Sequence, residues 1–154
     1  MPEHRRARHG IGRKFQVPSI CKELTVRQNL QVAYSKRPSP WHNMLVWPGS
    51  EKRDRIEEIA KFTGIQDRLD AQAAYLSHGE TQWLEISMLI VQDSKMILMD
   101  EPTAGMTIAE TGKTAEIFNL LRGQHTLVVV EHDMAFVREI AQVVTVLHQG
   151  KVLS

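Results

Sequence analysis

A short apolar run that ends in two adjacent carboxylates constrains the fold of this chain more than any other feature. Residues 96–99 are apolar, and Asp100, Glu101 and Pro102 follow them. A continuous apolar run of this length predicts a strand that is buried on both faces, as in a parallel sheet. The strand would carry its two acids to the carboxyl edge of the sheet, where α/β folds bind ligands. A strand that merely ends in a solvated acidic turn is the alternative, and the run alone leaves both open.

A second apolar run, Leu127–Val130, is also short and mostly β-branched, and it ends in Glu-His-Asp, whose histidine is His132. Two adjacent parallel strands would place Asp100, Glu101 and His132 at one edge of the sheet. A carboxylate there can orient or deprotonate a water, and an imidazole can hydrogen-bond a phosphate oxygen. The order of the two runs therefore favours a site that activates water or binds phosphate at this edge, over an acidic turn that is merely solvated.

A turn with the composition of a helix start precedes both strands. The sequence Leu-Ser-His-Gly-Glu at 76–80 comes before a helical pattern over residues 82–91. The face that we expect to turn inward carries Leu84, Met88 and Val91. Free N–H groups and the positive end of the dipole make a helix start an anion site. The plainer interpretation is a capping box, with Ser77 as N-cap and Glu80 at N3. Because the two apolar runs that end in acids and a histidine follow this turn in the sequence, we favour the anion site.

This ordered set of motifs resembles the ATP-binding subunit of ABC transporters. Residues 76–80 resemble the signature motif Leu-Ser-Gly-Gly-Gln, with His78 in place of the first glycine and Glu80 in place of the glutamine. Residues 97–100 are similar to Walker B, and Glu101 stands where the family has its catalytic glutamate.

Three further segments extend the resemblance over nearly the whole chain. Residues 104–107, Ala-Gly-Met-Thr, stand at the D-loop, whose common form is Ser-Ala-Leu-Asp. His132 matches the switch histidine. Residues 10–16, Gly-Ile-Gly-Arg-Lys-Phe-Gln, resemble the approach to the Q-loop, with Gln16 as the lid glutamine.

The resemblance implies a fold, cofactors and roles. The fold would be a P-loop NTPase-like α/β fold, of which the chain holds a partial ATP-binding domain over 1–154. The Q-loop and helical subdomain would span about 17–92, and about 93–154 would form the Walker B to switch-histidine half of a mostly parallel sheet. The cofactors would be ATP and Mg²⁺, with Asp100 and Gln16 at the metal. Glu101 would polarise water and His132 would stabilise charge on the γ-phosphate.

The resemblance also implies partners. Two such subunits would meet head to tail, so that the signature of one binds the nucleotide of the other. The signature residues concerned are Ser77, His78, Gly79 and Glu80. Transmembrane permease subunits would contact the Q-loop region, which places the protein peripherally at the cytoplasmic face of the plasma membrane. No nucleic-acid partner is implied.

The variants within the motifs are similar to those of branched-chain amino acid importer ATPases. His78, the Gly-Met-Thr D-loop and the sequence of 10–16 most resemble the urea importer's ATP-binding subunit, as does Gln-Trp-Leu-Glu-Ile at 82–86. The solute expected from this resemblance is a small polar molecule, either urea or a branched-chain amino acid.

The given sequence contains no phosphate-binding loop of the form Gly-x-x-x-x-Gly-Lys-Ser/Thr. The nearest match is Gly-Lys-Thr at 112–114, but position 107 is a threonine and no strand precedes it. Residues 107–121 instead predict a helix. Its expected inner stripe carries Ile117, Leu120 and Leu121. Since the family carries Walker A before the Q-loop, we expect a fragment of a longer protein or a truncated gene start, inactive by itself.

Composition excludes several other classes. A hydrophobic content of 42% with 24% charged residues is normal for a globular fold. The net charge of +1 gives no general attraction to nucleic acid. The basic residues within 1–14 could form a nucleic-acid arm, but we favour an exposed segment before the Q-loop. The single cysteine, Cys21, forms no internal disulfide, and the seven histidines lack zinc-ligand spacing.

The remaining elements are predicted from periodicity and breakers. Helices are expected over 25–33, 51–63 and 133–141, and a terminal hairpin over 143–153 turns at Gln149-Gly150. Thr25 should cap the first helix and Gly64 should close the second. Residues 38–49 contain three prolines and predict a loop, in which Trp41 and Trp47 either pack or face a partner.

Two other classes of protein are alternatives to the transporter subunit. A soluble ABC-type ATPase of DNA maintenance would place a long coiled coil between Gln16 and Ser77, which are only about 60 positions apart with prolines between them. The second alternative is a non-catalytic fragment that lacks the P-loop. It is the expected character of residues 1–154 taken alone.

Overall fold

The computed structural model describes residues 11–13, 20–34 and 50–153. The predicted Q-loop residue Gln16, the loop of Trp41 and Trp47 and most of the basic N-terminal segment lie outside these ranges.

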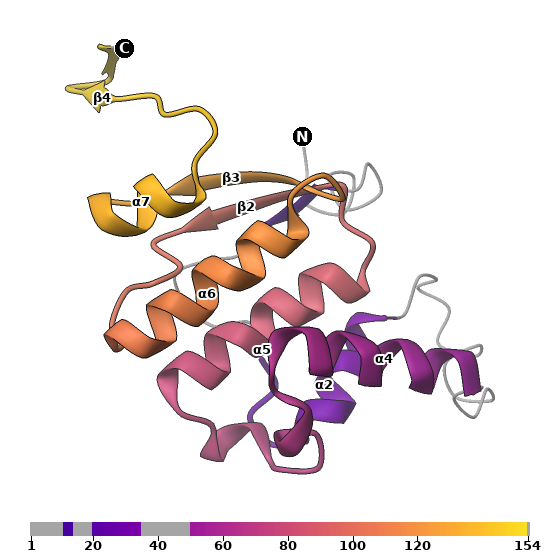
Figure 1. Cartoon of the computed structure of the whole chain (residues 1–154). Helices are drawn as coiled ribbons and strands as arrows, with labels where there is room; N and C mark the ends of the chain where they lie inside the picture. The colour runs from indigo at the N-terminus through magenta and orange to yellow at the C-terminus, as the bar shows by residue number, and fades with distance from the viewer. Residues whose placement is uncertain (1–10, 14–19, 35–49, 154) are drawn as a thin grey trace.

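Three parallel strands form the sheet that positions the site. They are β1 (Ile11–Arg13), β2 (Met96–Asp100) and β3 (Thr126–Val130), in the order β1-β2-β3. Met96 of β2 is paired with Ile11 on one side and with Thr126 on the other. Parallel neighbours need a crossover, and α6 (Ile108–Leu121) supplies it between β2 and β3. The predicted α/β class with a parallel sheet is therefore confirmed (Figure 1).

Helices gather on one side of this sheet (Figure 1). They are α2 (Val26–Ala33), α4 (Ser50–Thr63), α5 (His78–Val91) and α7 (Met134–Ile140) besides α6, with short 3₁₀ turns η1 (Gln66–Arg68) and η2 (Ala73–Tyr75) before α5. Among the described residues, none of the helices has the length and apolar character that crossing a membrane requires.

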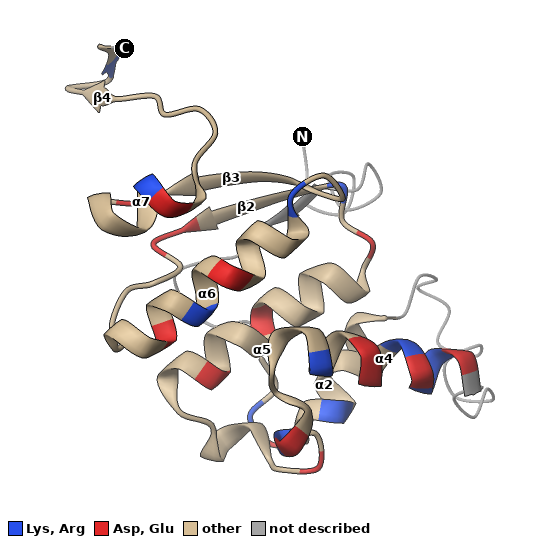
Figure 2. Cartoon of the chain, viewed as in Figure 1, with Lys and Arg blue, Asp and Glu red and all other residues tan. Residues whose placement is uncertain are grey.

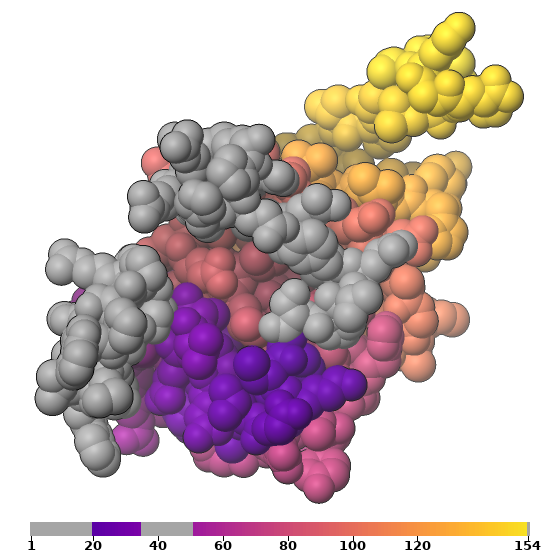
Figure 3. All heavy atoms as spheres, turned by 180° about the vertical axis from the view of Figure 1, so that it is seen from behind, coloured from indigo at the N-terminus to yellow at the C-terminus, as the bar shows by residue number. Residues whose placement is uncertain are grey.

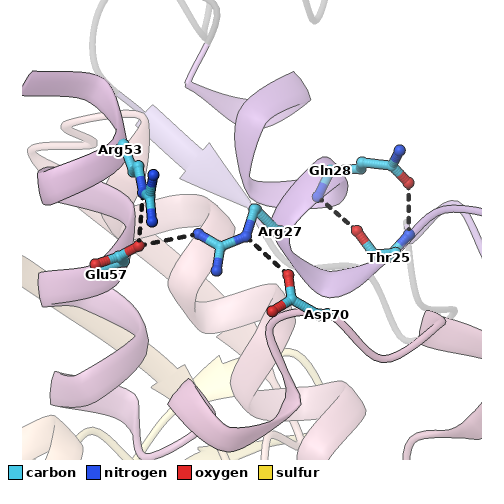
Figure 4. Close-up of polar contacts among 6 residues, drawn as sticks. All are labelled: Thr25, Arg27, Gln28, Arg53, Glu57 and Asp70. Atoms are coloured by element: carbon cyan, nitrogen blue, oxygen red, sulfur yellow. Dashed lines mark hydrogen bonds and ion pairs between the residues drawn. The ribbon is translucent and has the colours of Figure 1, made fainter. Parts of the chain in front are cut away.

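Local capping explains where these helices begin. Thr25 Oγ1 accepts from Gln28 N at 3.2 Å, and Thr25 N donates to Gln28 Oε1 at 2.8 Å, which makes a capping box (Figure 4). Asp133 accepts from two N–H groups at the start of α7. At the other end of α4, Gly64 has a φ of +69°, the left-handed conformation that ends helices. The predicted starts at Thr25 and Asp133 and the end at Gly64 are confirmed.

Ion pairs fix α2 against α4 on the exposed side. Arg27 of α2 bonds Glu57 of α4 at 3.2 Å and Asp70 after η1 at 3.0 Å (Figure 4). Arg53, one turn before Glu57, binds the same carboxylate at 3.1 Å. Charges of both signs line the exposed surface of α4, as Figure 2 shows.

The core lies between the sheet and the helices. Its largest fully buried side chains include Leu30, Ile56, Leu84, Ile97, Phe118 and Phe136. Phe118 of α6 and Phe136 of α7 meet edge to face at 5.7 Å between ring centroids, which docks α7 on α6.

The predicted inner faces of α5 and α6 are partly wrong. Ten of the 14 residues of α5 are buried, because the helix is enclosed rather than laid on a surface by one face. On α6, Ile117 and Leu121 are buried as expected, but Leu120 is 58% exposed and Phe118 packs inward instead.

Burial of both sheet faces is also wrong for the described residues. Ile97 and Met99 of β2 are buried, whereas Val128 and Val130 of β3 are 45% and 60% exposed. Because side chains alternate along a strand, these two pairs lie on opposite faces. The helices therefore cover one face of the sheet, and on the other face the described side chains are exposed along β3 and half-buried along β2.

The C-terminal hairpin is confirmed but shorter than expected. Strands β4 (Leu147–His148) and β5 (Lys151–Val152) are antiparallel, and Gln149 and Gly150 have φ of +47° and +75° as a two-residue hairpin turn requires. Residues 143–146, predicted as strand, are not in a strand. The hairpin projects away from the rest of the described chain (Figures 1 and 3).

Candidate functional site

The carboxyl edge of the sheet brings the predicted acid and histidine together. Glu101 follows β2 directly, and its N–H donates to the carbonyl of Val130 at 2.9 Å, which continues the pairing with β3. His132 follows β3, and its Nδ1 lies 3.6 Å from Glu101 Oε1. Both side chains remain open to solvent, at 76% for His132 and 41% for Glu101. A substrate could therefore reach both groups from the same side.

Glu101 also has an unusual backbone conformation. Its φ of +46° lies in the left-handed region, which costs a residue with a Cβ about 1–2 kcal/mol. The turn that follows is closed by Ala104 N, which donates to the Glu101 carbonyl at 3.2 Å. Such strain is concentrated at functional sites.

Asp100 is the last residue of β2 and lies opposite Val130 of β3. It is half-buried. Carboxylate oxygens suit Mg²⁺, which commonly takes one or two carboxylates together with waters and phosphates. Across the described ranges, His, Cys, Asp and Glu form no group of three that could hold a metal ion. A single carboxylate such as that of Asp100 is compatible with a magnesium ion whose other ligands are phosphates and water.

Glu131 is a site residue that the sequence analysis did not single out. Its side chain is only 1% exposed. It accepts hydrogen bonds from the hydroxyl and the N–H of Thr103, and from the N–H groups of His132 and Asp133. Burial works against its charged form, but these hydrogen bonds outweigh that cost and lower the pKa of Glu131. The signal was present, because Glu131 is a third acid directly after an apolar strand.

The Glu131 carboxylate joins two turns. Thr103 belongs to the turn after β2, and His132 belongs to the turn after β3. Since both turns bond the same buried carboxylate, the separation of Glu101 and His132 depends on Glu131.

The signature turn begins α5 as a capping box. Ser77 Oγ accepts from Glu80 N at 3.1 Å, and Ser77 N donates to Glu80 Oε2 at 2.8 Å. Arg68 bonds the other oxygen of Glu80 at 2.7 Å. Partial burial opposes ionisation of Glu80, but the bonds from Ser77 and Arg68 outweigh it and lower the pKa of Glu80.

The capping box and an anion site are compatible here. The N–H groups of His78 and Gly79 belong to the first helical turn, whose donors have no acceptor within the helix. Glu80, in contrast, is occupied by Ser77 and Arg68. The plainer interpretation of the sequence is thus present in the structure, and it leaves two backbone donors for a ligand.

Two further segments singled out in the sequence are not part of the site as the structure describes it. Gln16, predicted at the metal, lies outside the described residues. The Gly-Lys-Thr sequence at 112–114 lies within α6, where Thr114 is buried and accepts from Trp83 Nε1 at 3.0 Å. It is part of a packed helix and not a phosphate loop, as predicted.

Comparisons with known proteins agree with these motifs. A family model described as ABC transporter matches residues 1–104. The high-affinity branched-chain amino acid transport ATP-binding protein LivG of Escherichia coli (strain K12) is 31% identical, over 100% of this chain and 64% of LivG. The D-allose import ATP-binding protein AlsA of the same organism is 34% identical over 94% of this chain and 28% of AlsA.

A solved structure shows the same fold over the whole chain. An ATP-binding cassette of an ABC transporter in its ADP conformation matches with a TM-score of 0.81 at 25% identity, covering 100% of this chain and 63% of that one. The chain thus spans 64% of the length of LivG and a similar share of that cassette. From the motifs, the fold and these matches, we conclude that the chain belongs to the ABC transporter family and carries part of its ATP-binding domain.

Proposed function

We propose that this chain is part of an ATP-binding and ATP-hydrolysing subunit that drives an ABC importer. The observation that carries the proposal is the 3.6 Å approach of His132 to Glu101, beside Asp100 at the sheet edge. Membership of the ABC transporter family supports it. The subunit would act peripherally at the cytoplasmic face of the membrane, with permease subunits and a second ATP-binding subunit as partners.

Each residue of the edge has a task in this proposal. Asp100 would hold Mg²⁺, and the chemistry that the ion would supply there is neutralisation of charge on the phosphates. Glu101 accepts a proton from the attacking water, and its left-handed backbone directs the carboxylate out of the sheet. His132 donates a hydrogen bond to the γ-phosphate, where charge develops. Glu131 acts through Thr103 and His132 by holding both turns.

The signature turn would serve the nucleotide of the second subunit. The N–H groups of His78 and Gly79, at the positive end of α5, would donate to its γ-phosphate. Ser77, His78, Gly79 and Glu80 thus belong to a shared site, in which the Glu80 carboxylate caps the helix through Ser77. Gln16 is proposed at the magnesium ion on resemblance alone.

For the solute we propose a small polar molecule, urea or a branched-chain amino acid. LivG is named for branched-chain amino acids, and a similar glutamine transport ATP-binding protein, GlnQ of Geobacillus stearothermophilus, is 30% identical. The His78 signature and the Gly-Met-Thr D-loop favour urea by resemblance. Uptake of labelled urea and labelled leucine by cells with and without the intact gene separates the two. Loss of neither uptake would contradict this choice of solutes.

Glu101→Gln tests the hydrolytic role. In a subunit that includes a Walker A segment, the variant should bind ATP normally but lose hydrolysis by at least about a hundredfold, because an amide cannot accept the proton. Phosphate release and nucleotide binding are measured side by side, with the exposed acid Glu139→Gln as a matched control. Hydrolysis at the parental rate would show that Glu101 is not the base.

The chain as given should behave differently. Residues 1–154 contain no phosphate-binding loop, so we expect no ATPase activity above background and only weak nucleotide binding. Turnover that disappears on Glu101→Gln would contradict this expectation and would show a complete site within these residues. The alternative of a non-catalytic fragment concerns only this chain, whereas the Glu101→Gln test concerns the subunit.

A further inference from the structure

One side chain joins the signature turn to the D-loop turn, residues 104–107. His78 Nε2 lies 2.7 Å from the carbonyl oxygen of Ala104, 26 positions further along the chain. A carbonyl oxygen only accepts, so the ring nitrogen must donate, and Nε2 carries the proton. The contact therefore selects one tautomer of His78. It also connects the two segments across the start of α5 and the loop before α6.

The D-loop leaves room for this imidazole because it has a glycine beside it. A Cβ built on Gly105 would lie 3.3 Å from His78 Nε2 and 3.4 Å from its Cδ2, and the φ of Gly105 is +74°. A side chain there would be strained by the backbone and crowded by the ring. The conformation of the D-loop and the ring of His78 are thus matched to each other.

A second close approach lies next to the first. A Cβ on Gly79 would fall 2.3 Å from Glu110 Oε1, which is closer than any real contact. Glu110 caps the start of α6 through Thr107. The first turns of α5 and α6 are therefore packed directly against each other beside the His78 bond.

Gln82, one helical turn after His78, also faces this ring nitrogen. Its Nε2 lies 3.5 Å from His78 Nε2, a longer approach than the 2.7 Å to the carbonyl oxygen of Ala104. The shorter contact makes the ring nitrogen a donor, so the Gln82 amide makes no bond to it in this orientation.

Further contacts connect α6 with α5 and with the end of α4. Trp83 of α5 donates to Thr114 of α6 at 3.0 Å. Lys113 Nζ lies 3.7 Å from the centroid of the Trp83 ring and 3.0 Å from the carbonyl oxygen of Gly64, at the end of α4. Since α6 follows the D-loop directly, these contacts anchor the body of the helix, and the His78 bond anchors the loop at its start.

From this geometry we infer that His78 is a positioning residue, which holds the D-loop to the signature turn so that both move as one body. The functional consequence of this inference rests on the proposed function, in which both motifs would face the nucleotide of the second subunit. Its structural content, a donated hydrogen bond that orders the D-loop, does not depend on ATP. A glycine at position 78, the common form of the signature, has no side chain with which to make this connection.

The tautomer of His78 is the first test. Long-range ¹H–¹⁵N correlation spectra of the labelled chain should show His78 in the Nε2–H form. His125 is an internal reference for the opposite form, because its Nδ1 lies 2.6 Å from the carbonyl oxygen of Ser94. His78 in the Nδ1–H form, or in a mixture of tautomers, would overturn the inference without any variant having to fold.

Amide hydrogen exchange in the D-loop is the second test. Ala104 N and Met106 N are bonded within the turn and report its order. His78→Phe keeps a ring but removes the donor, and exchange at both amides should become about two- to tenfold faster. His78→Gln restores an N–H donor and should return exchange to the parental rate. The amides of Ala135 and Phe136, capped by Asp133, are the distant reference.

Two outcomes would overturn a donor role. Equal exchange in the parent and in His78→Phe would show that the bond does not order the loop. Exchange in His78→Gln as fast as in His78→Phe would show that ring shape, and not the donated proton, is what matters. Neither measurement involves nucleotide, so failure here is distinguishable from failure of the proposed ATPase function.

Discussion

At the scale of single residues, the sheet edge depends on a carboxylate whose importance the sequence does not display. Asp100, Glu101 and His132 were predictable because acids and a histidine follow short apolar runs. Glu131 belongs to the same pattern, but its burial and its two hydrogen bonds from Thr103 arise only when two turns far apart in the chain meet. Sequence could suggest which residues reach the edge, but not which of them would be enclosed.

Glu131→Ala should be among the most destabilising substitutions in the chain. It would leave the N–H groups of Thr103 and His132 without their acceptor, so we expect the free energy of unfolding to fall by about 2–4 kcal/mol. Urea unfolding followed by circular dichroism measures this. The exposed acid Glu139, changed to Ala, should alter stability by no more than about 0.5 kcal/mol. Equal effects of the two substitutions would show that the buried carboxylate has no special structural role.

The same carboxylate predicts a pH dependence. Because the pKa of Glu131 is lowered in the folded state, its contribution to stability is fully present above the unfolded pKa of about 4.3. It is lost as the pH falls through the folded pKa. The stability difference between the parent and Glu131→Gln should therefore be constant near neutrality and shrink below about pH 4. A difference that stays constant down to pH 3 would contradict the lowered pKa.

At the scale of elements, helix starts were predictable and helix faces were less so. Thr25 caps its helix as expected, Ser77 forms the capping box of the plainer interpretation, and Asp133 caps α7, because capping needs only residues within a few positions of each other. Leu120 was assigned to an inner stripe and is exposed, because the orientation of α6 is decided by its contacts with α5 and α7.

Removing the cap of α7 tests this local control. Asp133 Oδ1 accepts from Ala135 N at 2.9 Å and from Phe136 N at 3.2 Å. Asp133→Ala should lower the free energy of unfolding by about 1 kcal/mol, whereas Asp133→Ser, which keeps an acceptor, should lower it by less than half as much. Equal losses in the two variants, measured by thermal unfolding, would indicate that Asp133 acts through something other than the cap.

At the scale of the whole molecule, apolar surface is left uncovered. Val128 and Val130 lie on the open face of the sheet, and β3 is its terminal strand in the described chain. The projecting hairpin adds exposed apolar residues: Val143 is 86%, Leu147 69% and Val152 66% exposed. The apolar runs predict cover on both sheet faces, and the helices of the described chain cover one. An open apolar face beside an unpaired edge favours association with another chain.

Residues 1–154 should therefore self-associate. Sedimentation velocity at about 30 μM should show dimers or larger species, since exposed strands and apolar surface associate at micromolar concentrations. Val128→Lys should shift the distribution toward monomer by placing a charge on the open face. Leu120→Lys, on the surface of α6, is the matched control and should change nothing. A parental chain that sediments as a well-folded monomer would contradict this prediction.

The sequence by itself determined the class of fold, the order of the elements and the acids and histidine that follow strands β2 and β3. These follow from periodicity, capping and the chemistry of neighbouring residues, all of which act over a few positions. Tertiary structure alone decided that α5 is enclosed, that one sheet face is open, that Glu131 is buried and that His78 reaches Ala104. Each of these depends on segments distant in the chain, and their contacts arise only when the helices and the sheet pack together.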